Sequence, residues 1–184
     1  MPEEIELKFP LAAWAALGTR LRALGFRVAR KRMRERNWIF DDPRQSLRRG
    51  GKLLRLRHAG TKWRLTAKGP RRAGALKRRA EAETEIADGG ACRAVLELLG
   101  WRESACYERW RTVWRRPGEA GEVARDETPF GVYLEIEGAA AWVRSMAREL
   151  GLAIAKAEPR SYPELYACFT ARRRRDRRWK APGR

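Results

Sequence analysis

The first residues of the chain alternate strictly between charged and apolar side chains. From Glu4 to Phe9 the sequence reads Glu-Ile-Glu-Leu-Lys-Phe. In a β-strand, successive side chains point to opposite faces, so Glu4, Glu6 and Lys8 would share one face and the apolar residues the other. Two carboxylates beside one ammonium on a rigid strand would suit a site that binds a divalent cation together with an anion.

The same alternation recurs along the chain, with one sign of charge on each segment. The acidic positions are Glu81, Glu83, Glu85, Glu135 and Glu137. The basic positions are Arg55, Arg57, Lys62, Arg64, Lys68, Arg109 and Arg111. Because like charges repel, a metal between the acids and a polyanion between the bases would relieve the strain of holding them together. We therefore expect these faces to line one cavity; a solvated sheet face is the alternative interpretation.

The hydrophobic pattern predicts about eight strands and three or four helices. Period-two segments predict strands over 4–9, 27–41, 52–58, 61–68, 81–86 and 102–115, then a strand ending near 126 and another over 132–137. Apolar residues at helical spacing predict helices over 11–24, 90–99 and 139–150, with a short helix beginning near 161. Residues 70–79 are predicted to form a basic loop.

Composition favours one globular domain with a polyanionic partner. The chain has 184 residues, 8 of them Trp, and a net charge of +19. Residues 172–184 hold eight basic residues and one acid, so we expect a domain over 1–171 followed by a basic tail, which would be a helix end or a disordered arm. Such a field attracts nucleotides, polyphosphate, nucleic acid or an anionic surface.

Cysteine usage and hydropathy point to a cytoplasmic location. Cys92, Cys106 and Cys168 have no spacing typical of a zinc site or a redox motif, which favours reduced thiols. Neither a signal peptide nor a window as long as a membrane span is visible, so no membrane partner is expected. The single histidine, His58, fits a solvent-facing or packed side chain better than a base. Among the tryptophans, only Trp38 and Trp110 are candidates for a binding pocket.

Glu4 to Lys8 is similar to the ExExK signature of the CYTH superfamily, the triphosphate tunnel metalloenzymes. Further segments resemble other motifs of that family in the same order. They are residues 40–43, 54–57, 65–69, 83–85, 109–111, 126–131, 134–138 and 160–162. At Arg109 and Arg160 this chain has Arg where the family pattern has Lys.

The resemblance implies an α+β fold: an eight-stranded antiparallel β-barrel that forms a polar tunnel, with helices packed outside. It implies Mg²⁺ or Mn²⁺ as cofactor. Carried over by position, the metal ligands would be Glu4, Glu6, Asp126, Glu135 and Glu137, with Glu83 and Glu85 as additional acids. The phosphate ligands would be Lys8, Arg55, Arg57, Lys68, Arg109, Arg111 and Arg160. Lys8, Glu4 and Glu6 would be catalytic, with Lys8 helping to activate water.

Three functions follow from this resemblance and from the charge pattern. The first is a metal-dependent triphosphatase acting on a small triphosphate, with inorganic triphosphate preferred. The second is a class IV type adenylyl cyclase, which would convert ATP to cyclic AMP in the same fold. The third is a non-catalytic module that binds polyphosphate or RNA through the basic wall and tail.

Overall fold

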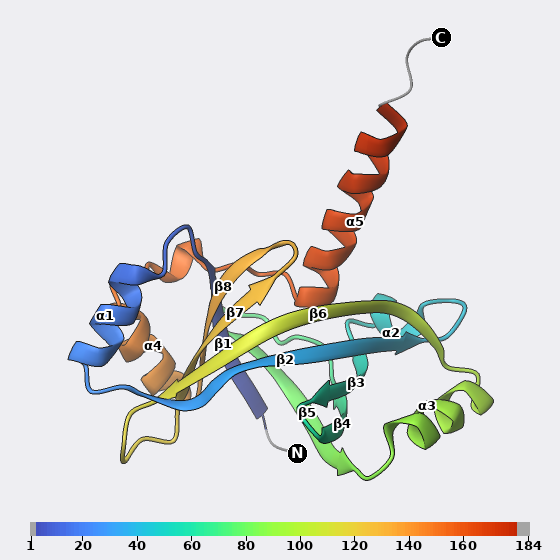
Figure 1. Cartoon of the computed structure of the whole chain (residues 1–184), viewed down its shortest axis with the longest axis horizontal. Helices are drawn as coiled ribbons and strands as arrows, with labels where there is room; N and C mark the ends of the chain where they lie inside the picture. The colour runs from blue at the N-terminus through green and yellow to red at the C-terminus, as the bar shows by residue number, and fades with distance from the viewer. Residues whose placement is uncertain (1–2, 180–184) are drawn as a thin grey trace.

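The computed structural model describes residues 3–179. Its strands form a closed antiparallel barrel in the order β1-β5-β4-β3-β2-β6-β7-β8 (Figure 1). The strands are β1 (Glu3–Pro10), β2 (Arg27–Asp41), β3 (Leu53–Ala59), β4 (Lys62–Lys68), β5 (Lys77–Ile86), β6 (Arg102–Arg115), β7 (Glu122–Thr128) and β8 (Gly131–Glu137). The barrel confirms the fold class expected from the sequence. Closure leaves the sheet with no free edge, and every strand can contribute one face to an interior.

The helices lie outside the barrel or extend away from it. They are α1 (Ala15–Ala23), α2 (Ser46–Arg49), α3 (Gly89–Leu98), α4 (Ala140–Glu149), the 3₁₀ turn η1 (Ile154–Lys156) and α5 (Tyr162–Trp179). Figure 1 shows α1 and α4 together at one side of the barrel, α3 at the other, and α5 projecting from the body. None of the helices within residues 3–179 combines the length and the apolar character needed to cross a bilayer.

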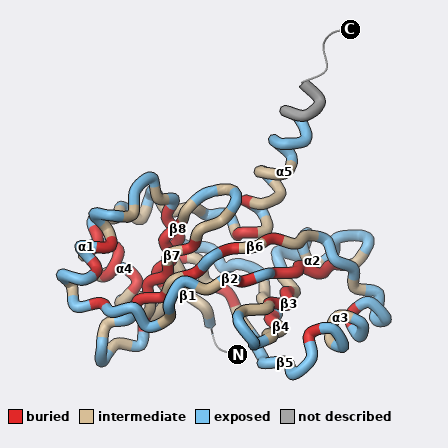
Figure 2. Tube along the Cα trace, viewed as in Figure 1, coloured by how far each residue is buried: buried red, intermediate tan, exposed pale blue. Residues whose placement is uncertain are grey.

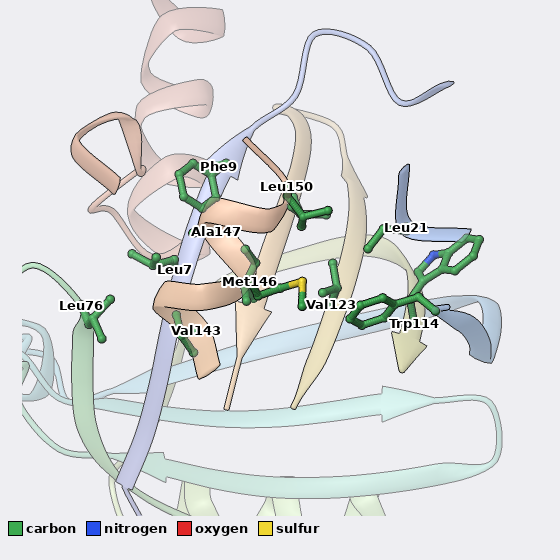
Figure 3. Packing of buried hydrophobic residues seen from close by; sticks show 13 residues of the cluster. Leu7, Phe9, Leu21, Leu76, Trp114, Val123, Val143, Met146, Ala147 and Leu150 are labelled. Atoms are coloured by element: carbon green, nitrogen blue, oxygen red, sulfur yellow. The ribbon is translucent and has the colours of Figure 1, made fainter. Parts of the chain in front are cut away.

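The largest hydrophobic core lies on the outer face of the barrel, beneath α1 and α4. Leu7 of β1 and Ile136 of β8 are almost wholly buried there against Val143 and Met146 of α4. Figure 3 shows Val143 beside β1 and the side chain of Met146 pointing toward Val123 of β7. The alternation of β1 therefore directs its apolar residues outward to the helices and leaves its charged residues for the interior.

Two smaller clusters complete the packing. Leu56 and Phe40 pack beneath α3 with Leu96, while Tyr107 and Tyr162 pack together where α5 begins. Figure 2 shows buried positions gathered along the barrel strands, whereas α3 is mostly exposed. Burial of apolar area at about 25 cal/mol per Å² makes these outer clusters the main favourable term for the fold.

The predicted elements hold except at five places. The first helix begins only at Ala15, because the N–H of Leu11 still donates to the carbonyl of Val132 at 2.8 Å. β5 begins at Lys77, inside the predicted basic loop, because that segment pairs with β1. The short turn α2 and the 3₁₀ turn η1 were not predicted.

The fifth difference is the length of the C-terminal helix, which was predicted to be short. α5 runs for 18 residues to Trp179, so most of the predicted basic tail continues the helix that begins at Tyr162. Residues 180–184 of the predicted tail lie outside the described residues. Cys92, Cys106 and Cys168 are free thiols, as expected.

Candidate active site

The barrel encloses a polar cavity of about 270 Å³ to which all eight strands contribute. Most of the residues predicted for the site line it. They are Glu4, Glu6, Lys8, Arg55, Arg57, Lys68, Glu83, Arg109, Arg111, Glu135 and Glu137. Strand alternation accounts for this gathering, since each strand turns its charged face inward. The shared cavity inferred from the charge pattern is therefore present.

The acidic side of the cavity is formed by β1 and β8, which are neighbours in the barrel. Glu6 pairs with Glu137 in the register of these strands. Two of the acids contact a base: Glu4 lies 2.5 Å from Nζ of Lys68, and Glu6 lies 3.1 Å from Nζ of Lys77. These ammonium groups partly offset the repulsion among the acids.

At Glu137 the ammonium groups do not fully offset the repulsion among the acids. Burial, together with the charges of Glu4, Glu6 and Glu135, raises the pKa of Glu137 to about 8. A carboxyl whose pKa is raised this far favours its neutral form unless a cation lies nearby. The acidic side therefore has a deficit of positive charge centred on Glu137.

The donor chemistry of this side fits Mg²⁺ or Mn²⁺, which prefer carboxylate oxygen and water. Glu4, Glu6 and Glu137 supply such oxygens from two adjacent strands. Within residues 3–179, no group of three or more His, Cys, Asp or Glu side chains is already arranged as a metal cage. A divalent ion would therefore have to displace the ammonium contacts of Lys68 and Lys77 to bind there.

The basic side faces the acids from β3 and β6. Arg57 is almost wholly buried, and burial together with the charges of Arg55 and Arg109 lowers its pKa to about 9. At neutral pH the guanidinium remains charged, so the lowered pKa reflects its burial and the crowding of like charges. Because a planar guanidinium forks onto phosphate oxygens, an anion bound here would relieve that repulsion.

Two residues that organise the basic side were not predicted from the sequence. Glu35 is almost wholly buried, with Oε2 lying 2.8 Å from Nε of Arg109 and 3.4 Å from Nη1 of Arg57. The side-chain oxygen of Asn37 accepts a hydrogen bond of 2.8 Å from Nε of Arg57. The period-two spacing of Glu35, Asn37 and Ile39 was the signal that could have placed them inside the barrel.

Asp126, predicted as a metal ligand, lies behind the basic side and does not line the cavity. Its carboxylate is fully buried and accepts hydrogen bonds from Arg109 at 2.9 Å and from Arg111 at 2.7 and 2.5 Å. The hydroxyl of Tyr162 donates to it at 2.6 Å. All its close partners are donors, so it anchors two arginines.

The carboxylate of Glu135 lies between the acidic and basic sides and contacts bases. Its carboxylate contacts Arg111 and lies 3.3 Å from Nζ of Lys8. Although burial acts in the opposite direction, Arg111 and Lys8 hold the pKa of Glu135 well below its usual range. It therefore stays ionised and is largely neutralised by these bases.

Lys8 lies between the two sides and contacts the start of α5. Besides Glu135, Nζ donates to the carbonyl of Arg160 at 3.3 Å and lies 3.7 Å from the ring centroid of Tyr162. Lys8 is almost fully buried, so its position is set by these contacts. An ammonium held this way is available to a ligand in the cavity without a large ordering cost.

Several other predicted residues lie away from the cavity. The guanidinium of Arg160 turns outward to Glu158, at 2.7 Å, so only its backbone carbonyl reaches the site. Glu85 forms an exposed pair with Lys62. The two candidate pocket tryptophans also lie outside: Trp38 packs in the cluster beneath α3, and Trp110 contacts Arg32. His58 stacks on Trp63 at a centroid distance of 4.3 Å, as a packed side chain would.

A family model described as the CYTH domain matches residues 2–162. The chain belongs to the CYTH family. The match covers the whole barrel and ends where α5 begins, so it includes every strand that lines the cavity. The family expected from the ExExK-like start of the sequence is confirmed.

The proteins to which this chain is similar include candidate cyclases. A candidate adenylate cyclase of Methanocaldococcus jannaschii is 27% identical over 135 residues, which cover 73% of this chain and 75% of that one. The structure of another candidate adenylate cyclase, from Vibrio parahaemolyticus, has a TM-score of 0.75 and 24% identity, covering 89% of this chain and 97% of that one. A candidate adenylyl cyclase from Hippeastrum, described as having a dominant triphosphatase activity, has a TM-score of 0.66 and 17% identity, covering 91% and 96%.

Proposed function

We propose that this CYTH protein is a divalent-metal-dependent hydrolase that releases phosphate from a small triphosphate, with inorganic triphosphate as its smallest substrate. One observation carries the proposal: the cavity inside the barrel has a mainly acidic side and a mainly basic side. Carboxylates of β1 and β8 face guanidinium groups of β3 and β6 across the interior. A cation on one side and a chain of phosphates on the other would satisfy both sets of charges.

In this proposal the basic side binds and aligns the phosphates. Arg55 and Arg57 would present guanidinium donors that match phosphate oxygens. Arg109 and Arg111, which are held by Asp126, add positive charge beside them, and Lys68 adds a point charge. Their fixed positions reduce the ordering cost of binding a flexible triphosphate. Phosphoryl transfer needs mainly positioning and charge neutralisation, which this wall would supply.

The acidic side would hold the metal through Glu4, Glu6 and Glu137. When bound, Mg²⁺ or Mn²⁺ neutralises phosphate charge and makes water a better nucleophile. Lys8 lies between both sides and would donate to a phosphate oxygen while orienting the attacking water. With inorganic triphosphate, the water oxygen would form a bond to the terminal phosphorus as the bridging P–O bond breaks. Phosphate and diphosphate would leave, each carrying one of the two protons of the water. We assign Asp126 and Glu35 to positioning the arginines.

A second candidate is an adenylyl cyclase, which the names of the relatives from Methanocaldococcus and Vibrio favour. In that reaction the ribose 3′ oxygen would attack the α-phosphorus of ATP and release diphosphate. The same charged cavity would serve both reactions, because both bind a triphosphate with a metal. The third candidate, a module that binds polyphosphate or RNA without turnover, needs the basic side alone and leaves the acidic side unused.

Identification of products separates these candidates. The purified protein is incubated with Mg²⁺ or Mn²⁺ and, in turn, inorganic triphosphate, ATP and thiamine triphosphate, and products are followed by phosphorus NMR. Phosphate release that stops when a chelator is added supports the proposed hydrolase. Formation of cyclic AMP from ATP would favour the cyclase over the hydrolase. Tight binding without turnover would favour the binding module.

A further inference from the structure

Arg30 of β2 lines the charged cavity, although it was not predicted for the site. Along β2, Glu35 and Asn37 point into the barrel at two-residue spacing. Continued without interruption, that spacing would bring Met33 and Lys31 inward and turn Arg30 outward. Instead, Lys31 is exposed and Arg30 is half-buried. An irregularity of the strand therefore turns Arg30 toward the interior.

The irregularity is a β-bulge. β2 and β6 lie side by side (Figure 1), and Met33 pairs with Arg111 while Arg30 pairs with Val113. Three steps along β2 are thus matched by two along β6, so β2 holds one extra residue between Met33 and Arg30. Bulges are common beside active sites, where they change the direction of a side chain. Here the bulge gives Arg30 the inward direction that Arg111 has on β6.

Arg30 differs from the other arginines of the cavity in its hydrogen bonds. Each of the others donates to a protein acceptor: Arg55 to Thr66, Arg57 to Asn37, Arg64 to Glu83, Arg79 to Gly69, Arg109 to Glu35 and Arg111 to Asp126. Among the residues that the structure describes, Arg30 has no such acceptor, and its Nε is buried without a partner. Its one ion-pair contact among them is long, at 3.8 Å from Nη2 to Oε1 of Glu35. The guanidinium therefore keeps donors available for a ligand.

The charge of Arg30 is also poorly compensated. Burial and the charge of Arg111 lower the pKa of Arg30, although Glu35 acts in the opposite direction. Glu122, which lines the same part of the cavity, pairs with Arg115 at 2.7 Å. An anion beside Arg30 would relieve its repulsion with Arg111 and accept from its guanidinium.

Arg30 lies at the end of the cavity away from α5. On β6, Tyr107 belongs to the cluster where α5 begins, and Val113, opposite Arg30, follows about 20 Å further along the strand. β7 begins at this end with Glu122, which pairs with Glu137 of β8. The side chain of Arg30 is 36% exposed here, so a ligand that reaches this end can contact it.

We propose that Arg30 is a substrate-binding residue whose guanidinium donates to the terminal phosphate, at the end of the cavity away from α5. The inference rests on the proposed function, since it takes the cavity as the triphosphate site. A phosphate there would give the guanidinium the acceptor that it lacks. β2, which otherwise positions arginines through Glu35 and Asn37, would then bind substrate directly.

Equilibrium binding tests this inference separately from catalysis. Calorimetry with Mg²⁺ measures the affinity of imidotriphosphate for the wild type and for Arg30→Met, which keeps an unbranched side chain but removes the guanidinium. Arg30→Gln is a second variant without the charge, and Arg30→Lys restores it. Arg32→Met is the matched control, because Arg32 lies on the same strand but pairs with Glu127 at the surface, at 3.0 Å. Circular dichroism checks that each variant is folded.

We expect Arg30→Met and Arg30→Gln each to weaken the binding of imidotriphosphate about tenfold or more, as loss of a hydrogen bond between charged groups would. Arg30→Lys should bind more tightly than Arg30→Met, and Arg32→Met should stay within about twofold of the wild type. Affinities of Arg30→Met and Arg30→Gln equal to that of the wild type would overturn the inference, because Arg30 would then serve only Glu35.

Phosphate release from inorganic triphosphate is scored separately. Weaker binding in the two Arg30 variants, together with no release by the wild type, would support the inference and count against the proposed function. Release by the wild type with no effect of Arg30 on binding would leave the proposed function standing and overturn the inference.

Discussion

Oε2 of Glu35 lies 2.8 Å from Nε of Arg109, and both side chains are almost wholly buried inside the barrel. The same oxygen lies 3.4 Å from Nη1 of Arg57. One carboxylate on β2 therefore holds two arginines, one from each neighbouring strand, that line the phosphate-binding side. Groups held in place before a ligand arrives reduce the entropy lost on binding, so Glu35 contributes to the site without lining it.

Replacement of Glu35 by Gln should destabilise the protein. The amide cannot neutralise Arg57 and Arg109, and loss of one partner of a buried ion pair costs about 3–5 kcal/mol. We expect the free energy of unfolding in urea to fall by about 3 kcal/mol. Glu108→Gln is the matched control, because Glu108 pairs with Arg34 at the exposed surface, where the loss should stay below about 0.5 kcal/mol. Equal stability of both variants would contradict this assignment.

Tyr162 links α5 to the arginines through Asp126. Tyr162→Phe removes the hydroxyl that donates to Asp126 at 2.6 Å but keeps the ring beneath Lys8. A hydrogen bond to a buried charge contributes about 1.5–3 kcal/mol, so thermal unfolding should show a loss of about 2 kcal/mol. Tyr166→Phe, on the same helix and in the same aromatic cluster, should cost less than about 0.5 kcal/mol. A loss for Tyr162→Phe no larger than the control would show that the hydroxyl contributes nothing.

The fold and the outline of the site could be predicted because strand alternation is local. The pattern from Glu4 to Phe9 already assigns each side chain to a face, and closure of the barrel then brings the charged faces together. Asp126, predicted as a metal ligand, does not line the cavity, because of a strand register that the local sequence pattern does not reveal. Its register opposite Arg111 places it behind two guanidinium groups, which surround its carboxylate.

Two other differences have similar physical causes. Glu35 was overlooked because β2 is charged at nearly every position from Arg30 to Arg36, and register shifts near Arg30 and Met33 obscure which residues face inward. The outward turn of Arg160 depends on Glu158, whose carboxylate accepts from it at 2.7 Å. Contacts between neighbours after a strand ends are not encoded in the alternation that predicts the strand.

Glu6→Gln should abolish metal-dependent turnover and leave the fold intact. The amide keeps the shape of the side chain but removes a charge from the acidic side, so metal affinity and turnover should fall at least about 100-fold. Phosphate release is measured over a range of Mg²⁺ or Mn²⁺ concentrations, with Glu4→Gln expected to behave alike. Glu97→Gln, in an exposed pair with Arg93 on α3, is the control and should retain turnover within twofold. Full activity of Glu6→Gln would remove Glu6 from the metal site.

Glu137 should make the metal-free protein less stable as the pH rises. Burial and the neighbouring acids raise its pKa to about 8. A carboxyl whose pKa is raised on folding stabilises the fold at pH values below its unfolded pKa, and that contribution is lost as the pH rises through the folded value. Between pH 5 and pH 8.5 in a chelator, the free energy of unfolding of the wild type should fall by about 2 kcal/mol more than that of Glu137→Gln. Each pKa unit corresponds to about 1.4 kcal/mol, and screening by solvent reduces the total.

Urea unfolding at several pH values measures this difference. Saturating Mg²⁺ should reduce the loss for wild type, since a cation favours the charged carboxylate. Each protein is also measured without metal, and that measurement is its reference. Parallel pH profiles for wild type and Glu137→Gln would mean that the acidic side carries no deficit of positive charge.

The central claim is that one cavity binds a cation on its acidic side and a triphosphate on its basic side. The most direct measurement is a crystal structure of the protein with Mn²⁺ and imidotriphosphate, using the anomalous signal of the metal. We predict a manganese peak at the carboxylates of Glu4, Glu6 and Glu137, with the phosphates contacting Arg55, Arg57 and Arg111. Manganese and imidotriphosphate both bound outside the barrel, with the cavity unchanged, would contradict the account.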